Sequence, residues 1–338
     1  MLYTNEKLAE LKHRWTTSRG KKLVKIIKET HCYLSPILFR EKIHGLPGIN
    51  DEEVSQGIDL RGIILSGFDF RVPIQDGDDG FAEELAILSD IHFEGAALRH
   101  CNFIEGKIHG CFFENADLSH SNFQDSKISD CIFKETECAS CNFDWTQFVN
   151  CNFTDANIKD VILGNTLTDQ KTTFGKALKS EKDGNFHFAS IEYKQIKEMF
   201  RNSSLHEIAD EYHYREMVAK RKTISVLSPS RWANYIFGDL LCKYGTSFTR
   251  VFFSGLFIIT ICALIFFENN ALQYHDPSDV YISLADALYF STVTFTTLGY
   301  GDFHAIGIMR FVAGAESFLG AALMSLFTVV VARRIIRD

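Results

Sequence analysis

The chain has 338 residues, of which 46% are hydrophobic and 23% charged, and it contains only 5 prolines. That composition excludes a disordered or collagen-like chain, and the length allows two or three domains. Acidic residues outnumber basic ones by 43 to 35, so a dedicated nucleic-acid binder is not expected.

Residues 1–57 are predicted to be mostly helical. The first 30 residues are charged throughout and lack the continuous apolar stretch of a signal peptide, so we expect them to stay in the cytoplasm. Apolar residues at helical spacing, such as Leu8 and Leu11 or Leu23 and Ile27, indicate helices that end near Pro47. The sequence predicts no role for this region.

Apolar residues recur at every fifth position from residue 93 to residue 163. A mostly small residue stands two positions before each of them, and both sets are predicted to face inward. Residues 91–165 include 16 charged side chains, and none falls on the 30 inward positions. Chance would give this about 3 times in 10,000. The series is Phe93, Leu98, Phe103, Ile108, Phe113, Leu118, Phe123, Ile128, Phe133, Cys138, Phe143, Phe148, Phe153, Ile158 and Leu163.

The aromatic residues of this series repeat every twenty positions. If four five-residue sides make one coil, successive coils lie about 4.8 Å apart and like rings stack as ladders. Asn102-Phe103 and Ala116-Asp117-Leu118 resemble the A(D/N)LXX units of the pentapeptide-repeat family. The resemblance covers about residues 58–165 and implies a right-handed, four-sided β-helix. We expect this domain over 58–175, with an insertion at 71–90.

Two features of this region are interpreted as structural. Cys111, Cys131 and Cys151 share an inward column that favours small residues, and buried cysteine usually acts as a small hydrophobic residue. Residues 76–80 faintly resemble a calcium loop, but Ile87 stands where the bidentate glutamate belongs. A turn is therefore predicted there, without a bound metal.

Two helical elements are predicted between the repeats and the C-terminal third. Apolar stripes that include Tyr193 and Tyr212 indicate a helical hairpin over 186–222. The segment 229–245 contains Trp232 and Phe237 beside an apolar stretch, which favours an interfacial amphipathic helix on the inner leaflet. A solvent-exposed linker helix is the alternative.

The C-terminal region 249–338 contains two apolar stretches that are long enough to span a membrane. They predict spans over about 250–267 and 308–332, with a pore helix over about 283–295 between them. The pore helix precedes residues 297–301, Thr-Leu-Gly-Tyr-Gly, an order close to the TVGYG filter of potassium channels. Residues 249–334 therefore resemble a two-transmembrane-helix potassium channel.

This resemblance implies which atoms bind the ion. Backbone carbonyls of Thr297, Leu298, Gly299 and Tyr300 from four chains would replace the hydration shell of K⁺. Gly299 and Gly301 would permit the backbone dihedrals that turn successive carbonyls toward one axis. Leu298 replaces the usual valine at a position that faces the supporting wall, so selectivity is expected to persist.

Five further residues are predicted to support or bend the pore. Thr296, Asp302 and Glu316 are assigned to filter support. Glu316, the only charged residue between Phe311 and Ala332, either lines the cavity or bonds to the pore helix behind the filter, and we favour the second role. Gly314 and Gly320 either form a hinge of the inner helix or permit close helix packing.

The sequence thus predicts a multi-domain membrane protein with a cytoplasmic β-helix, an α-helical linker and a tetrameric pore of two spans per chain. Basic residues flank the spans and the loop between them is acidic, so both termini are expected in the cytoplasm, with the pore in the plasma membrane. The expected function is passive, selective conduction of K⁺ without a cofactor. The expected partners are three further copies of the chain, the lipid bilayer and an unknown cytoplasmic protein.

The alternative function is a membrane-anchored interaction module whose pore is vestigial or non-selective. Pentapeptide-repeat proteins include DNA-mimicking inhibitors of topoisomerases, and residues 91–165 carry 11 acidic and 5 basic side chains. That surplus is interrupted by lysines, whereas mimicry requires a continuous acidic stripe. An enzyme is not expected, because no nucleophile–base pair, phosphate loop or metal cluster is evident.

Overall fold

The computed structural model describes residues 4–29, 57–75, 82–274 and 282–337. The chain divides into two compact units, Met1–Thr223 and Ile224–Asp338, and each is described by itself. The loop at 76–80 that resembles a calcium site lies outside the described residues.

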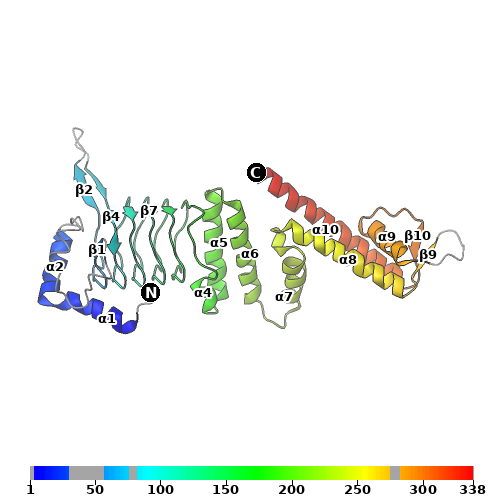
Figure 1. Ribbon diagram of the computed structural model, residues 1–338, viewed down its shortest axis with the longest axis horizontal. Helices are drawn as coiled ribbons and strands as arrows, with labels where there is room; N and C mark the ends of the chain where they lie inside the picture. Colours follow the sequence, from blue (N-terminus) through cyan, green and yellow to red (C-terminus); the bar gives the residue numbers. More distant parts are fainter. Residues whose placement is uncertain (1–3, 30–56, 76–81, 275–281, 338) are drawn as a thin grey trace. The chain divides into compact units, whose positions relative to one another are not determined.

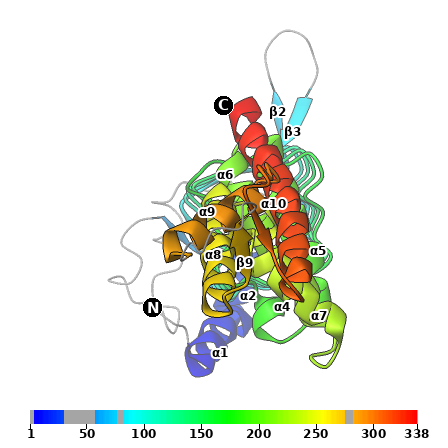
Figure 2. The same cartoon turned by 90° about the vertical axis from the view of Figure 1, so that its right-hand side faces the viewer.

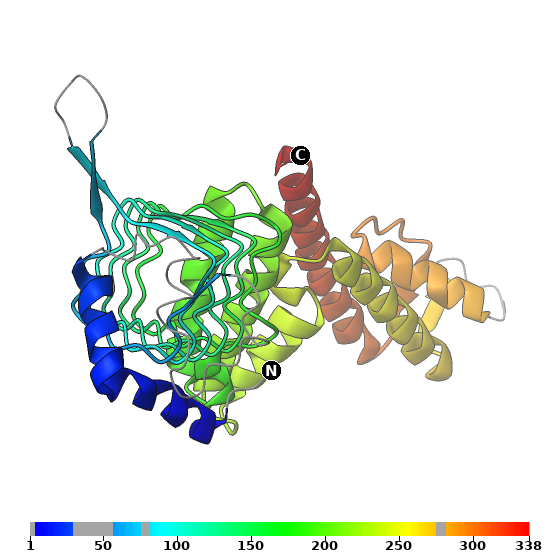
Figure 3. The same ribbon diagram turned by 60° about the vertical axis from the view of Figure 1, so that its left-hand side comes forward.

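The first unit is built on parallel coils of twenty residues (Figures 1 and 3). The strands β4 (Ile87–Ser89), β6 (Lys107–His109), β7 (Lys127–Ser129) and β8 (Gln147–Val149) form one parallel sheet. Its register pairs Lys107 with Lys127 and Lys127 with Gln147. Isolated bridges on the other sides, such as Asn102 with Asn122, have the same offset. The predicted twenty-residue period of the coils is confirmed.

The predicted aromatic ladder fills the interior of the coils. Ring centroids lie 5.2 Å apart between Phe93 and Phe113, 4.9 Å between Phe113 and Phe133, and 4.6 Å between Phe133 and Phe153. All four rings are buried. The corners between the sides use a left-handed backbone at every fifth residue, with φ from 53° to 63° at the non-glycine corners from Asp90 to Asp160, such as His100, Asn115 and Asp130. Asn, Asp and His tolerate this conformation better than most residues.

The insertion in the repeats is shorter than the predicted 71–90. The first coil, which begins with β1 (Ile58–Asp59), pairs with β5 (Ile91–His92) at an offset of 33 residues. The strands β2 (Val72–Gln75) and β3 (Ala82–Leu85) form an antiparallel hairpin that leaves the coil. The five-residue phase resumes at the buried Ala86 and Leu88, because these residues occupy inward positions of the same series.

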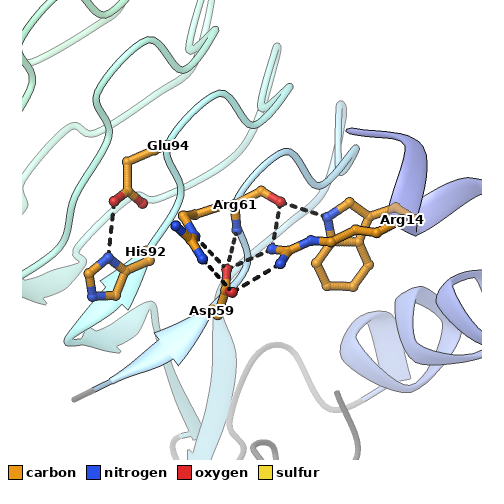
Figure 4. A network of polar contacts seen from close by, with 6 residues as sticks. Arg14, Asp59, Arg61, His92 and Glu94 are labelled. Atoms are coloured by element: carbon orange, nitrogen blue, oxygen red, sulfur yellow. Dashed lines mark hydrogen bonds and ion pairs between the residues drawn. The ribbon is translucent and has the colours of Figure 1, made fainter. Parts of the chain in front are cut away.

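The N-terminal helices pack on the first coil through a buried ionic network (Figure 4). These helices are α1 (Asn5–His13), the 3₁₀ turn η1 (Arg14–Thr16) and α2 (Ser18–Glu29). Arg14 donates to Asp59 at 2.9 Å and 2.6 Å and to the Arg61 carbonyl at 2.7 Å. Arg61 donates to the same carboxylate at 3.1 Å, and the Trp15 indole donates to the Arg61 carbonyl at 2.7 Å. Residues 4–29, which lie in the region without a predicted role, therefore cover the open end of the β-helix.

Replacing Asp59 with alanine is expected to destabilise the first unit by about 3–5 kcal/mol, because two guanidinium groups then lose their buried counter-charge. The control is Asp69→Ala, which removes the carboxylate from an Asp–Arg pair of the same spacing that is partly exposed and should cost about 1 kcal/mol or less. Chemical denaturation of both variants measures the difference. Equal losses would contradict the role of the network.

The same network predicts how stability depends on pH. Burial by itself would raise the pKa of Asp59, but hydrogen bonds from Arg14 and Arg61 hold it well below its ordinary value. A carboxyl with a depressed folded-state pKa stabilises the fold above its unfolded pKa. The contribution of Asp59 is therefore present above about pH 4 and is lost as the pH falls below that value.

The other end of the β-helix is covered by a helical hairpin that continues the aromatic stack. The hairpin is formed by α5 (Phe186–Asn202) and α6 (His206–Thr223), and the short helix α4 (Lys179–Lys182) precedes it. Phe174 stacks on Phe153 at 5.0 Å and meets Tyr212 of α6 edge-on at 6.4 Å. Lys197 of α5 and Glu216 of α6 form a buried ion pair at 2.8 Å. The hairpin and the coils therefore share one core.

The second unit contains three main helices that lie side by side (Figure 2). They are α8 (Phe248–Glu268), α9 (Leu284–Phe295) and α10 (Met309–Arg337). Two short strands, β9 (Leu272–Tyr274) after α8 and β10 (Phe303–Ala305) before α10, pair with each other antiparallel.

The segment 229–245 is not the continuous helix that its composition predicts. It forms α7 (Pro229–Ala233), a π-helical turn η2 (Asn234–Leu240) and a 3₁₀ turn η3 (Lys243–Gly245). The chain leaves the helical conformation after Leu240, and Lys243 and Tyr244 adopt φ of 49° and 53°. The Tyr244 ring packs over Gly238, where a Cβ would lie 2.5 Å from the ring. Trp232, Phe237 and Leu240 are nevertheless exposed, as expected of an interfacial segment.

Candidate ion-conduction site

Two helices of the second unit are long and apolar enough to cross a membrane. They are Phe248–Glu268 and Met309–Ala332, and only 22% of the most apolar window of each is buried. Their bounds agree closely with the two predicted spans. Most of their apolar surface is thus left for lipid or for other protein chains.

Helix α9 ends directly at the predicted filter. It begins at a capping box in which Ser283 and Asp286 exchange hydrogen bonds, and its last turn is closed by Thr296, whose hydroxyl donates to the Thr292 carbonyl at 2.7 Å. The helix packs on both α8 and α10. The negative end of its dipole therefore points toward the segment that follows, where it favours a cation.

The backbone of the predicted filter alternates in the sign of φ. Thr297, Gly299 and Gly301 have φ of 59°, 53° and 81°, whereas Leu298 and Tyr300 do not enter the left-handed region. Such alternation can turn successive carbonyls to one side, instead of to opposite sides as in a strand. A Cβ at either glycine would meet nothing within 4 Å in the protomer, so dihedral freedom and not space requires glycine there.

Thr297 was assigned to the filter from the sequence, but its left-handed conformation was not foreseen. A β-branched residue in this region is strained, and such strain gathers at functional sites. The side chains of Leu298 and Tyr300 are 60% and 69% exposed in the protomer. Asp302 accepts a hydrogen bond from the backbone of Phe303 at 3.1 Å, which places it at the start of β10.

No pattern in the sequence predicts the β9–β10 pair. This ribbon pairs Phe303 with Tyr274 and Ala305 with Leu272, and the Ile306 amide donates to the Ala271 carbonyl at 2.9 Å. It therefore connects the end of α8 to the residues that directly follow the predicted filter.

The two candidate hinge glycines differ in their surroundings. A Cβ at Gly320 would lie 2.0 Å from the Phe295 carbonyl oxygen, so this glycine permits close packing of α10 on the end of α9. A Cβ at Gly314 would meet nothing within 4 Å, and its hinge role stays a prediction. Glu316 is buried and contacts Ser291 of α9, the second of its two predicted roles.

No metal centre is found among the described residues, in which no three His, Cys, Asp or Glu side chains are placed to hold one. Cys138 and Cys141 have the spacing of a CxxC pair, but both are buried inside the coils. The Cys131 sulfur accepts a hydrogen bond from the Cys111 amide at 3.4 Å, and burial raises the pKa of Cys101 to about 12. These thiols therefore act as interior packing residues.

Comparison with protein families identifies two domains in the chain. Residues 253–337 match the family model described as an ion channel, and residues 98–134 match pentapeptide repeats in eight copies. The chain therefore contains an ion channel domain and a pentapeptide-repeat domain. Neither family is generally enzymatic, and no curated protein matches the chain.

Similar solved structures are pentapeptide-repeat proteins. Rfr23 from the cyanobacterium Cyanothece 51142 is 18% identical, with a TM-score of 0.21, over 37% of this chain and 95% of that one. A pentapeptide-repeat protein of the Arabidopsis thaliana thylakoid lumen is 21% identical, with a TM-score of 0.15, over 38% and 68%. QnrB1, a plasmid-mediated fluoroquinolone resistance protein, is 14% identical, with a TM-score of 0.16, over 38% and 81%. At these TM-scores the likenesses carry no further argument.

Proposed function

We propose that this protein is a potassium-selective channel that conducts passively through a pore made by four copies of the chain. The observation that carries the proposal is the alternating sign of φ over Thr297–Gly301, at the end of the short helix α9 and between two helices of membrane-spanning length. K⁺ would be held by the carbonyls of Thr297, Leu298, Gly299 and Tyr300, as in filters built from backbone oxygens.

The tetramer is supported by what a single protomer leaves exposed. Carbonyls from one chain cannot surround an ion, whereas four chains around one axis can replace its hydration shell. In the protomer, large apolar side chains beside the pore remain uncovered, including Leu298, Tyr300, Phe311 and Phe318. Assembly around the filter would bury part of this surface and leave the rest to lipid.

The proposed setting is the plasma membrane, with both termini in the cytoplasm. Lys243 and Arg250 precede α8, and Arg333, Arg334 and Arg337 follow the second apolar span. This is the arrangement that the positive-inside rule favours. The repeat domain is proposed to be a right-handed, four-sided β-helix in the cytoplasm, where it organises the tetramer, contributes to gating or binds a protein partner.

The proposal is tested by reconstituting the full-length protein in liposomes and measuring K⁺ and Na⁺ flux, with Ba²⁺ as a filter-blocking cation. We expect K⁺ flux that Ba²⁺ blocks, a strong preference over Na⁺, and a tetramer by native mass measurement. Equal K⁺ and Na⁺ flux would instead support a non-selective pore. A correctly inserted protein without any flux would support the interaction module.

Removing residues 1–223 is expected to leave a potassium-selective pore with an altered open probability. The cut belongs at the boundary between the two units, because α4, α5 and α6 share a core with the β-helix. A cut near residue 175 would remove Phe174 and uncover Tyr212, which meets it edge-on. Single-channel recording beside the full-length protein provides the measurement. Unchanged open probability in an intact tetramer would contradict a gating role, and lost selectivity would contradict the separation of the domains.

A further inference from the structure

A buried acid lies where the three helices of the second unit meet. Glu316 of α10 is 1% exposed, and its Oε1 contacts the hydroxyl of Ser291 in α9. The same hydroxyl lies 2.8 Å from the carbonyl oxygen of Ile259 in α8. One serine oxygen therefore connects both candidate spans to the helix that precedes the filter.

The hydrogen atoms at this junction can be counted. A serine hydroxyl has one hydrogen to donate. The Ile259 carbonyl can only accept, so its contact with Ser291 is a hydrogen bond only when the serine donates its hydrogen there. The contact between Ser291 and Glu316 is then a hydrogen bond only if the carboxyl group donates. An ionised Glu316 would instead compete with Ile259 for a single hydrogen, which would leave two acceptors facing each other.

The surroundings of Glu316 offer little to a negative charge. Its Oε2 is buried and accepts no hydrogen bond within the described part of the chain. From α8 the Cys262 thiol faces the carboxyl group, and a thiol is a weak donor. From α9 the facing polar group is Ser291, and α10 itself carries no other charge between residues 311 and 332. An unpaired charge in such a place is costly.

The junction is linked to the candidate filter through the end of α9. Gly320, one helical turn after Glu316, lets the Phe295 carbonyl approach α10. Helix α10 thus meets the pore helix at two points, Ser291 and Phe295. Phe295 stands two residues before Thr297, so a shift of α9 at these contacts would be passed to the backbone of the filter.

We propose that Glu316 is a positioning residue that, as the neutral acid, donates a hydrogen bond to Ser291 and so fixes the pore helix between the two spans. The proposal rests on the proposed function, since it assigns α9 to an ion pore. When the pH rises far enough to remove this proton, the hydrogen bond to Ser291 is lost and a charge is left in an apolar layer. Ion flux therefore falls as the pH rises.

The test compares full-length variants in liposomes over a range of pH. Glu316→Gln keeps a neutral donor, so we expect K⁺ flux within about twofold of wild type at neutral pH and no alkaline loss. Glu316→Ala and Ser291→Ala each remove one buried hydrogen bond, so we expect about a tenfold loss of flux. Ser325→Ala is the matched control, because that exposed hydroxyl bonds only to its own helix at 2.8 Å and should be silent.

The pH profile separates positioning from a general structural role. Other titratable groups, such as Asp302 and His304, are present in wild type and in Glu316→Gln alike, so the difference between their profiles isolates Glu316. Identical profiles, or a loss in Glu316→Gln as large as in Glu316→Ala, would overturn the proposal. If Glu316→Ala does not fold, the comparison of the wild type with Glu316→Gln still decides the outcome.

Infrared spectroscopy provides a readout that does not depend on conduction. The wild type should show the C=O stretch of a protonated carboxyl group that is absent from Glu316→Gln. Its absence from the wild type overturns the proposal whatever the flux. Its presence in a protein that conducts no K⁺ upholds the neutral acid at the Ser291 junction, while the proposed channel function fails.

Discussion

Replacing Gly301 with alanine is expected to abolish K⁺ flux while the tetramer stays intact. Gly301 has φ 81°, a conformation that a Cβ disfavours by about 1–2 kcal/mol. No atom lies within 4 Å of the position that the Cβ would take, so the fold of the protomer should tolerate the substitution. The backbone of the filter should not, because relaxation of φ redirects a carbonyl that K⁺ must reach.

The structure offers a matched control for this substitution. Gly307 also has a positive φ, 56°, and open space around its Cβ position, but it lies after β10 and outside the filter. Gly307→Ala should therefore retain K⁺ selectivity at a similar cost in backbone strain. Flux assays and native mass measurements on both variants decide the outcome. Wild-type conductance in Gly301→Ala, or in the companion Gly299→Ala, would refute the filter assignment.

Replacing Phe133 with aspartate is expected to unfold the β-helix. The ring is fully buried between Phe113 at 4.9 Å and Phe153 at 4.6 Å. The substitution deletes a core aromatic residue, which alone costs about 3–5 kcal/mol, and it adds a buried charge without a partner. The coils on either side lose their stacking surface together, because each coil is stabilised mainly by its neighbours.

The adjacent residue provides the control for Phe133→Asp. Lys134 points outward, and its ion pair with Glu135 at 3.7 Å is partly exposed. Lys134→Asp introduces the same side chain one position further along and should cost about 1 kcal/mol or less. Circular dichroism and resistance to proteolysis measure both variants. Equal behaviour of the two proteins would show that the inward register is wrong.

Much of the repeat domain could be predicted because its signal is local and periodic. The five-residue pattern that includes Phe93, Phe113 and Phe133 places these rings in the core and leaves no charged residue at an inward position. The break in the period was harder to place. Leu88 lies inside the predicted insertion but belongs to the five-residue series, five positions before Phe93. The offset of 33 residues between Ile58 and Ile91 becomes visible only when the coils are paired.

The candidate filter was visible in the sequence because its chemistry depends on a short, ordered set of residues. The glycines at 299 and 301 mark positions where φ must be positive. The positive φ of Thr297 could not be predicted from its residue type, because a threonine in the left-handed region is held there by the surrounding structure. The same holds for the β9–β10 ribbon, whose strands of three residues are too short to show a period.

The sequence by itself determined the twenty-residue coil, the two apolar helices and the position of the filter-like segment, because each depends on residue type at fixed spacing along the chain. Only the tertiary structure decided what residues 4–29 cover, where 229–245 breaks, and which helix Glu316 meets. Arg14 and Asp59 are 45 residues apart, and Glu316 and Ser291 are 25 apart. Their partners are chosen by packing in three dimensions, and no periodicity along the chain encodes that choice.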